Sequence, residues 1–353
     1  GTWASYVRIL NPANGETLSL VELENNESAV SICFCPMEGE TYVVVGTVKD
    51  LVQYPERSFA GGFLRTYRLN QQAQLELVHA TAVEHIPQAM IPFRGRLLVG
   101  VGKILRLYSL GQKKLLRKCE NKNFPNLICQ LSAYDDRIYV GDVTESFHFA
   151  LFNERENTIG VFADDIAPRW LTSSEWLDPD TIAGADKFGN FYVCRVPKDI
   201  AERAGDSAGS RFLWERGYLN GAPNRADEVV QFHTGEIITS LRRCRLITGG
   251  DETLVYSTVM GGLGCFTPLP TTEDVEFFQT LEMHLRTEAP PLCGREHMMF
   301  RSSYFPVQAA IDGDLCEQFS TLEPSKQRSI AEEMERVPSE VTKKLEDFRN
   351  KIL

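Results

Sequence analysis

The stretch that most suggests chemistry is TIAGADKFGNFYV, residues 181–193, in which two glycines lie on either side of an Asp-Lys pair. A glycine-rich loop with a lysine can cradle a phosphate, provided that a helix follows and offers its backbone amides. Here an alternating, strand-like run follows instead. The pattern therefore predicts a hairpin turn in which Gly189 supplies a positive φ and Asp186 accepts hydrogen bonds from the backbone.

The six histidines and nine cysteines are the other residues that could form a catalytic or metal site. Cys293 and His297 are close in sequence, but no second Cys/His pair lies nearby to complete a four-ligand zinc site. His148, within SFHFAL, is interpreted as a strand residue rather than a catalytic base. An odd number of cysteines without framework spacing predicts the free thiols of an intracellular protein. We expect no metal and no cofactor.

Sequence motifs of known enzyme classes do not support catalysis. The chain has no Gly-x-Ser-x-Gly elbow of an α/β-hydrolase and no repeated Ser-x-Asp-x-Gly-x-x-Trp turns of a sialidase. Asp312-Gly313-Asp314 is too short for a calcium loop and lacks the glutamate at the twelfth position. The sequence therefore predicts a protein that is not an enzyme.

The elements around these residues follow a repeat. Four segments each show a short apolar strand that ends in Gly, a few turn residues and an alternating strand. The last three glycines recur about every 40–45 residues, which is the length of a four-stranded propeller blade. A fifth copy, at 252–269, has Ser257 in place of the glycine. The shared glycines are Gly46, Gly100, Gly141 and Gly184.

The repeat predicts a mainly β fold with an incomplete β-propeller over residues 1–269. Two strands are expected in 5–22, then four complete blades, then three strands between 236 and 269, which makes roughly five and a half blades. We expect the missing strands to come from a segment outside these residues, because an incomplete ring leaves unpaired strand edges.

After residue 270 the period changes to that of helices, which predicts a small C-terminal α-helical domain over 270–353. Thr271 and Asp274 form a capping pattern before an apolar stripe that includes Val275, Phe278, Leu281 and Leu285. Two further stripes are predicted at 325–337 and 339–353. The members of these two stripes are Ile330, Met334 and Val337, and Val341, Leu345, Phe348 and Ile352.

The net charge of −11 argues against a broad nucleic-acid-binding face, because such faces are built from clustered Lys and Arg. The most basic stretch, 113–122, is interpreted as the solvated side of a strand. The sequence contains no run of 18 apolar residues, so it predicts no membrane-spanning helix.

Propellers commonly bind partners through the loops on one face. The loop that enters a blade's innermost strand and the turn between its second and third strands emerge on the same face. Trp, Arg and Met within a polar rim are typical of protein-interface anchors, although Trp170 fits a core position between blades equally well. The predicted partner-binding rim consists of Lys103, Glu145, Arg169, Trp170, Asp186, Lys187, Phe188 and Met260.

A string of motifs also resembles one protein family. GADKFGN, VGVGK, KKLLRKCEN, FADD…PRW, LNGA, EMHLR…PPLCGREH, IDGDLCEQF and KKLEDFR occur together here. They resemble the C-terminal part of the splicing factor 3B subunit 3 family, the large spliceosome-associated proteins. The resemblance runs from Trp3 to about Arg349 and fades in 198–212. It implies most of the family's third seven-bladed propeller, followed by a helical domain.

The resemblance implies a nuclear, non-catalytic scaffold of the splicing factor 3b complex, within the small nuclear ribonucleoprotein that selects the intron branch site. Implied partners are the HEAT-repeat subunit, the ten-kilodalton subunit, the PHD-finger-like zinc subunit and the N-terminal propellers of the same protein. RNA contact would be at most indirect, and no membrane is involved. Implied contact surfaces are 162–190, 238–262 and the C-terminal helices.

Three other functions stay open at this point. The wider superfamily includes the large damaged-DNA-binding subunit and the large cleavage and polyadenylation specificity subunit. The same fold could therefore serve as an adaptor of a ubiquitin ligase or of a 3′-end processing complex. A propeller that binds RNA directly is the third alternative.

Overall fold

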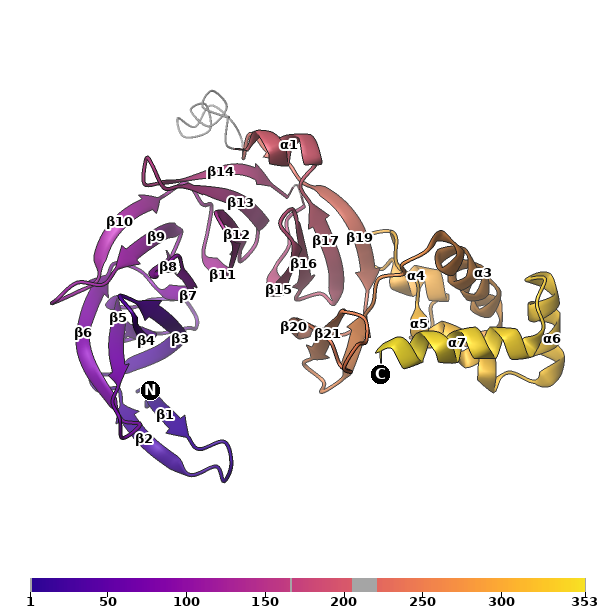
Figure 1. Ribbon diagram of the computed structural model, residues 1–353, viewed down its shortest axis with the longest axis horizontal. Helices are drawn as coiled ribbons and strands as arrows, with labels where there is room; N and C mark the ends of the chain where they lie inside the picture. Colours follow the sequence, from indigo (N-terminus) through magenta and orange to yellow (C-terminus); the bar gives the residue numbers. More distant parts are fainter. Residues whose placement is uncertain (1, 166, 205–220, 353) are drawn as a thin grey trace. The chain divides into compact units, whose positions relative to one another are not determined.

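The computed structural model describes residues 2–165, 167–204 and 221–352. The chain divides into two compact units. Unit 1 comprises residues 1–171 and 196–226, and unit 2 comprises 172–195 and 227–353. The fold is mainly β, and its antiparallel sheets follow one another along the chain (Figure 1).

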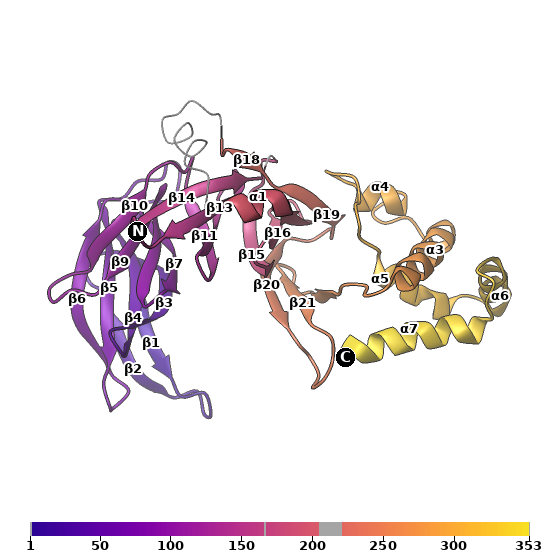
Figure 2. The same cartoon turned by 45° about the horizontal axis from the view of Figure 1, so that its top comes forward.

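Unit 1 contains a two-stranded sheet and three larger sheets in which sequential strands lie side by side. A short parallel strand, β18, is added at the outer edge of β14 (Figure 2). The strands of the first two sheets are β1 (Tyr6–Leu10), β2 (Thr17–Glu22), β3 (Glu27–Met37), β4 (Glu40–Lys49), β5 (Gly61–Leu69) and β6 (Leu75–Val83). The next sheet is β7 (Pro87–Phe93), β8 (Arg96–Val101), β9 (Ile104–Ser109) and β10 (Leu116–Asn121). The last holds β11 (Ile128–Tyr134), β12 (Arg137–Asp142), β13 (Ser146–Asn153), β14 (Thr158–Asp164) and β18 (Asn224–Arg225), and helix α1 spans Lys198–Arg203.

Gly46 and Gly100 lie on the second strands of their sheets, β4 and β8, where the next sheet approaches closely. A Cβ on Gly46 would lie 2.7 Å from the carbonyl oxygen of Pro87, and one on Gly100 would lie 2.6 Å from the Ile128 side chain. Any larger residue would therefore force the sheets apart. The repeat that is visible in the sequence thus records how closely successive sheets pack.

The sheets of unit 1 pack face to face through apolar side chains. Cys35 and Val44 of one sheet share a buried cluster with Val99 of the next. Leu98 shares another with Val140 of the following sheet. The central strands are apolar on both faces, which explains why they read as short continuous runs rather than as alternating patterns.

Unit 2 holds a four-stranded and a three-stranded sheet, except that Leu171, the first residue of β15, belongs to unit 1. Phe191 stacks on Phe266 with ring centroids 3.8 Å apart, and this pair joins the two sheets. The strands are β15 (Leu171–Asp178), β16 (Thr181–Asp186), β17 (Asn190–Arg195), β19 (Asp227–His233), β20 (Ile238–Cys244), β21 (Thr253–Thr258) and β22 (Leu263–Phe266).

Helices follow the last strand of unit 2, and all of those described except the one at His297–Arg301 share one apolar cluster, which includes Phe278, Leu281, Phe319, Ala331 and Val341. The helices are α3 (Thr272–Glu288), α4 (His297–Arg301), α5 (Gly313–Glu317), a 3₁₀ turn at Gln318–Thr321, α6 (Pro324–Glu333) and α7 (Pro338–Ile352).

Most of the predicted helix signals are confirmed. The Thr271 hydroxyl accepts a hydrogen bond of 3.1 Å from the Asp274 amide and begins α3. One assignment is wrong, because Val337 was expected on the stripe of the second helix but lies exposed beyond its end. Helix α6 ends before Glu335, whose positive φ of 57° turns the chain into α7.

Among the described residues, the order of the sheets follows the predicted order of strands: two strands, then four sheets of at least four strands, then three strands. The number of propeller blades stays a prediction. The short strand β18 was not foreseen. All nine cysteines lie in described residues and are reduced thiols, as expected. Among the described residues, no helix is both long enough and apolar enough to cross a membrane. The closed ring and the domain boundary at 269/270 stay predictions.

Candidate protein-interaction surface

The turn between β16 and β17 has the predicted geometry. One carboxylate oxygen of Asp186 accepts hydrogen bonds from the amides of Phe188 (2.9 Å) and Asn190 (3.1 Å), and the other accepts one from the Asn190 side chain (2.8 Å). Gly189 has a φ of 83°. Because Asp186 is buried, it shapes the turn and does not offer a contact to a partner.

The tip of this turn is formed by Lys187 and Phe188. Phe188 is 43% exposed, and the Lys187 ammonium lies 5.1 Å from the centroid of its ring. An aromatic ring held on a rigid turn beside a cation can be buried by a partner with little loss of conformational freedom.

A third side chain at this tip comes from a distant part of the sequence. Tyr304 follows helix α4, and its ring centroid lies 5.4 Å from that of Phe188. Tyr304 is itself 56% exposed. Sequence reasoning missed this residue, and the only available signal was the aromatic-rich, irregular stretch 287–313 that contains it.

The turn between β21 and β22 lies beside these residues. The Thr234 amide donates to the Gly189 carbonyl (2.8 Å), and the Val259 amide donates to the Ile237 carbonyl (2.9 Å). The loop 234–237 is therefore hydrogen-bonded to both turns. Met260, at the tip of the second turn, is 78% exposed. We call Lys187, Phe188, Val259, Met260 and Tyr304 the Phe188 face.

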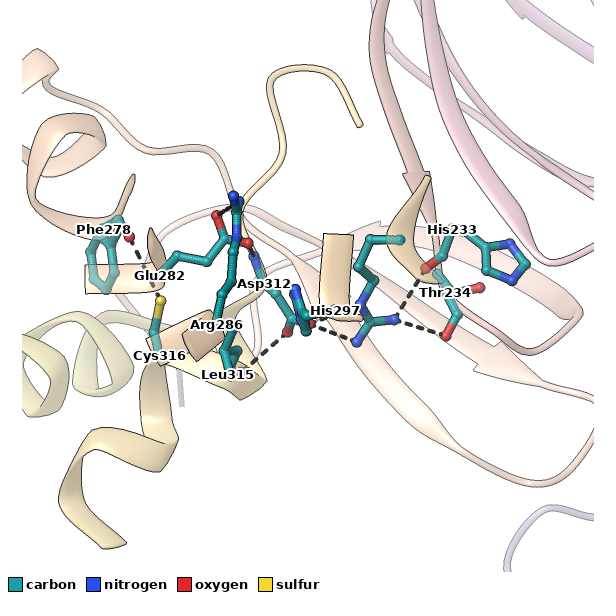
Figure 3. A network of polar contacts seen from close by, with 10 residues as sticks. His233, Thr234, Phe278, Glu282, Arg286, His297, Asp312, Leu315 and Cys316 are labelled. Carbon is teal, nitrogen blue, oxygen red and sulfur yellow. Dashed lines mark hydrogen bonds and ion pairs between the residues drawn. The ribbon is translucent and has the colours of Figure 1, made fainter. Parts of the chain in front are cut away.

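A polar network behind this face anchors the segment that carries Tyr304 (Figure 3). One guanidinium nitrogen of Arg301 donates to the carbonyls of His233 and Thr234, both at 3.1 Å, at the end of β19. The Nε of Arg301 donates to the Asp312 carboxylate at 2.8 Å. Phe300 packs over Gly235, where a Cβ would lie 2.7 Å from its ring.

Asp312 is the centre of this network. Its carboxylate contacts the His297 ring nitrogen at 2.8 Å and accepts the amide of Leu315 at 3.2 Å, which caps α5. Its own amide donates to Glu282 on α3 at 3.0 Å. Burial alone would raise the pKa of Asp312, but the Arg301 charge and the hydrogen bonds from His297 and Arg301 hold that pKa below its usual value. Asp312 thus links helices α4 and α5 through its carboxylate and α3 through its amide, and Arg301 extends this network to the end of β19.

His233 links this network to the Asp186 turn. Its pKa is lowered by burial and, to a lesser extent, by the positive charge of Arg301, so the ring is neutral near pH 7. Because the Asn190 amide nitrogen donates to Asp186, the Asn190 oxygen faces His233 Nδ1 at 3.1 Å. The His233 Nδ1–H therefore donates to Asn190, which fixes the tautomer.

The remaining predicted rim residues lie in unit 1. Lys103 and Glu145 are exposed at the tips of the turns after β8 and β12, and Trp170 is exposed in the loop before β15. The Val143 amide donates to the Leu127 carbonyl at 2.9 Å, so this turn does lie beside a loop that enters an innermost strand. Arg169 is buried beside Asp165 (3.8 Å), which makes it a structural residue.

The arrangement offers exposed side chains that a partner can bury. Among the residues that the structure describes, no three His, Cys, Asp or Glu side chains gather closely enough to hold a metal ion. The Phe188 face instead combines three apolar or aromatic tips, a tyrosine and a lysine on hydrogen-bonded turns. Whether these residues and those of unit 1 act together stays a prediction.

Residues 4–321 match the family described as the CPSF A subunit region. The chain is 52% identical to "Spliceosome-associated protein 130 A" of Arabidopsis thaliana, over 99% of this chain and 29% of that protein. It is 50% identical to "Splicing factor 3B subunit 3" of Danio rerio, again over 99% of this chain and 29% of the relative. "Probable splicing factor 3B subunit 3" of Dictyostelium discoideum is 48% identical over 100% of this chain and 28% of its own length.

This chain thus spans less than a third of the length of these relatives. The predicted resemblance is confirmed by the identity along the whole chain. The chain belongs to the CPSF A subunit family, in the branch whose members are named splicing factor 3B subunit 3 and spliceosome-associated protein 130.

Proposed function

We propose that this chain acts in pre-mRNA splicing as a non-catalytic scaffold of the splicing factor 3b complex, within the ribonucleoprotein that selects the intron branch site. The observation that carries the proposal is the identity of about half of all residues to proteins named as splicing factors, over 99% of the chain. The role is nuclear, since the spliceosome acts in the nucleus.

The architecture that suits this role is a seven-bladed propeller with helices after its last blade. In this proposal the sheets serve as most of the blades, and the helices after residue 270 serve as the small C-terminal domain. The relatives are much longer than this chain, so further segments can complete the ring. A propeller of this kind offers faces built from loops, on which partners can bind.

The partners we propose are proteins: the HEAT-repeat subunit, the ten-kilodalton subunit, the PHD-finger-like zinc subunit and the N-terminal propellers of the same polypeptide. The Phe188 face is the contact region that we favour, since its exposed aromatic and methionine tips are the residue types of interface anchors. A net charge of −11 favours protein partners over direct RNA binding.

Affinity purification of the full-length polypeptide from nuclear extract tests this function. We expect the HEAT-repeat subunit to co-purify, with a recovery that ribonuclease treatment does not change. Recovery of a cullin without splicing subunits would instead indicate a ubiquitin-ligase adaptor. Tight RNA binding that falls steeply with salt would indicate a direct RNA-binding protein.

A further inference from the structure

One position of the third strand recurs in three successive sheets of unit 1. In each sheet it directly follows the residue that pairs with the shared glycine. By this register, the position is occupied by Arg65 in β5, Arg106 in β9 and His148 in β13. Arginine is a permanent cation, whereas the charge of histidine depends on pH. The third sheet therefore differs from the first two in a way that a change of pH can reach.

The two arginines are each held by carboxylates. Arg65 donates to both oxygens of Glu27, at 2.8 and 2.6 Å. Arg106 donates to both oxygens of Glu84 and, through its Nε, to Glu120 at 2.9 Å. In both sheets this position thus places a fixed positive charge against acidic side chains.

The third sheet also has a carboxylate at this place, but it takes its cation from another segment. Asp164 of β14 lies directly opposite His148 in the strand ladder, and both residues are buried. The Asp164 carboxylate pairs with the guanidinium of Arg225 in β18 and accepts the amide of Ala222 at 2.9 Å. The Asp164 carbonyl accepts the amide of Ala226 at 2.8 Å. Strand β18 therefore supplies the positive charge that an arginine of the third strand supplies in the two preceding sheets.

The surroundings of His148 make its charge sensitive to β18. Among the described residues, its Nδ1 is buried without a hydrogen-bond partner, and the Phe124 ring packs edge-on against it at 5.5 Å between centroids. The charged groups that act on the ring are Asp164 of β14, Asp142 of β12 and Arg225 of β18. Burial is the strongest influence and lowers the pKa of His148; the two carboxylates raise that pKa, and Arg225 lowers it. The net shift is downward, so the ring is neutral near pH 7.

We propose that protonation of His148 releases residues 221–226 from β14, so that this contact is a pH-sensitive switch within unit 1. The charge of Arg225 opposes protonation of His148, and by reciprocity the protonated ring must oppose the binding of Arg225. Protonated His148 can pair with Asp164 in its place, because the two residues lie opposite each other. The Arg225 side chain is 42% exposed, so its charge returns to water at little cost.

The direction of the switch follows from the sign of the linkage. His148 binds a proton less readily while Arg225 is docked than after Arg225 has left. The contact is therefore strongest above the pKa that His148 has in the released state, and it weakens as the pH falls below that value. Release opens the outer edge of β14, with which β18 pairs in parallel.

This inference rests on unit 1 alone and does not depend on the splicing role. Hydrogen exchange in the full-length polypeptide at pH 7.5 and pH 5.0 tests it, with protection factors that correct for the intrinsic effect of pH. We expect the protection of the Ala222 and Ala226 amides to fall at least tenfold at pH 5.0. The amides of the central strand β12 should keep their protection, which would show that the sheet stays folded. Unchanged protection of the two alanine amides would overturn the proposal.

Two substitutions of His148 sharpen the test. His148→Arg restores the residue type of the preceding sheets, so we expect the two alanine amides to lose protection at least tenfold already at pH 7.5. His148→Gln cannot become charged and should keep them protected at both pH values. His79→Gln removes another buried histidine of unit 1 and is the matched control, which should still lose protection at pH 5.0.

Two results with these variants would contradict the switch. One is a loss at pH 5.0 in His148→Gln as large as in the unmodified protein, because another group would then be responsible. The other is full protection of the alanine amides in a folded His148→Arg variant. If circular dichroism shows that His148→Arg does not fold, the comparison of His148→Gln with the unmodified protein decides.

Discussion

The turn at Asp142 in unit 1 and the turn at Asp186 in unit 2 use the same device with different surroundings. In both, an aspartate at the end of a second strand accepts hydrogen bonds from the backbone of the turn. Asp142 accepts from the amides of Thr144 (3.0 Å) and Glu145 (3.1 Å). Asp186 accepts from the amides of Phe188 and Asn190.

The difference lies in what surrounds each turn. Asp142 also accepts the amide of Asn126 (2.9 Å), so it joins its turn to the loop that enters the same sheet. Asp186 is linked through Asn190 to His233, and hence to the Arg301–Asp312 network. The same type of turn therefore only connects two strands in one sheet, whereas in the other it also carries the exposed Phe188. The Arg301–Asp312 network behind the turn, rather than the turn itself, distinguishes the candidate surface.

The largest effect on stability is expected from removing Asp312, the centre of the Arg301–Asp312 network. Asp312→Ala leaves Arg301 and His297 without their shared carboxylate and removes the cap of α5. We expect a loss of about 3–5 kcal/mol in the free energy of unfolding, as for other broken buried ion pairs. Urea denaturation followed by circular dichroism measures it. Glu317→Ala, which removes an exposed partner of Arg349, is the control and should cost less than about 1 kcal/mol.

The next effect concerns binding. Phe188→Ala combined with Tyr304→Ala removes two exposed rings, so we expect folding to be retained while affinity for the protein partner falls by about 10–100-fold. Isothermal titration calorimetry with the purified HEAT-repeat subunit measures the change. Tyr54→Ala, which removes an exposed ring of unit 1, should leave affinity unchanged. Equal losses in both variants would remove the distinction between the Phe188 face and the rest of the surface.

The two turns can be compared directly through Asp186→Ala and Asp142→Ala. Asp186→Ala loses three hydrogen bonds within its turn, and Asp142→Ala loses two from its turn and two from Asn126. We expect about 1–2 kcal/mol of destabilisation in each. Only Asp186→Ala should also weaken partner binding, since only that turn carries Phe188. Thermal unfolding and the same titration separate the two effects. Binding that is weakened in Asp142→Ala alone would reverse the assignment.

The smallest effect is a pH dependence that both units share. Burial is the main cause that lowers the pKa of His148 in unit 1 and that of His233 in unit 2. The charged groups that act on His233 are Arg301, Asp186 and Arg295. The unfolded chain binds protons on these rings near pH 6.5, whereas the folded chain does so only at lower pH. Stability is therefore full above pH 6.5 and falls as the pH drops below it.

Melting temperatures recorded at pH 7.5, 6.5 and 5.5 measure this slope. We expect His233→Gln to lower the melting temperature at pH 7.5 but to flatten its decline toward pH 5.5. A decline as steep as that of the unmodified protein would show that His233 does not contribute to the pH dependence.

Much of the fold could be predicted because its signals are local. The recurring glycines record the approach of successive sheets, and Thr271 with Asp274 marks the start of α3. The turn at Asp186 was predictable from residue types alone. Tyr304 was not, because its contact with Phe188 spans more than a hundred residues and depends on how α4 is anchored.

Two predicted rim residues show that position in the repeat does not predict whether a side chain is exposed. Arg169 and Asp186 were assigned to the surface from their position in the repeat, and both are buried. A charged residue at a loop or strand end can turn inward when hydrogen bonds or an ion pair satisfy it, and sequence patterns do not reveal those partners. A triple variant that includes Arg169 would therefore confuse unfolding with loss of contact. Substitutions confined to Lys187, Phe188 and Tyr304 avoid this.

The most direct test is reconstitution of the full-length polypeptide with the HEAT-repeat subunit, followed by size-exclusion chromatography. The variant combines Lys187→Glu, Phe188→Ala and Tyr304→Ala, with Tyr54→Ala as the matched control. We predict that the control co-elutes with its partner, whereas the triple variant elutes separately and keeps the circular dichroism of the unmodified protein. Full co-elution of the folded triple variant would contradict a protein interface on the Phe188 face.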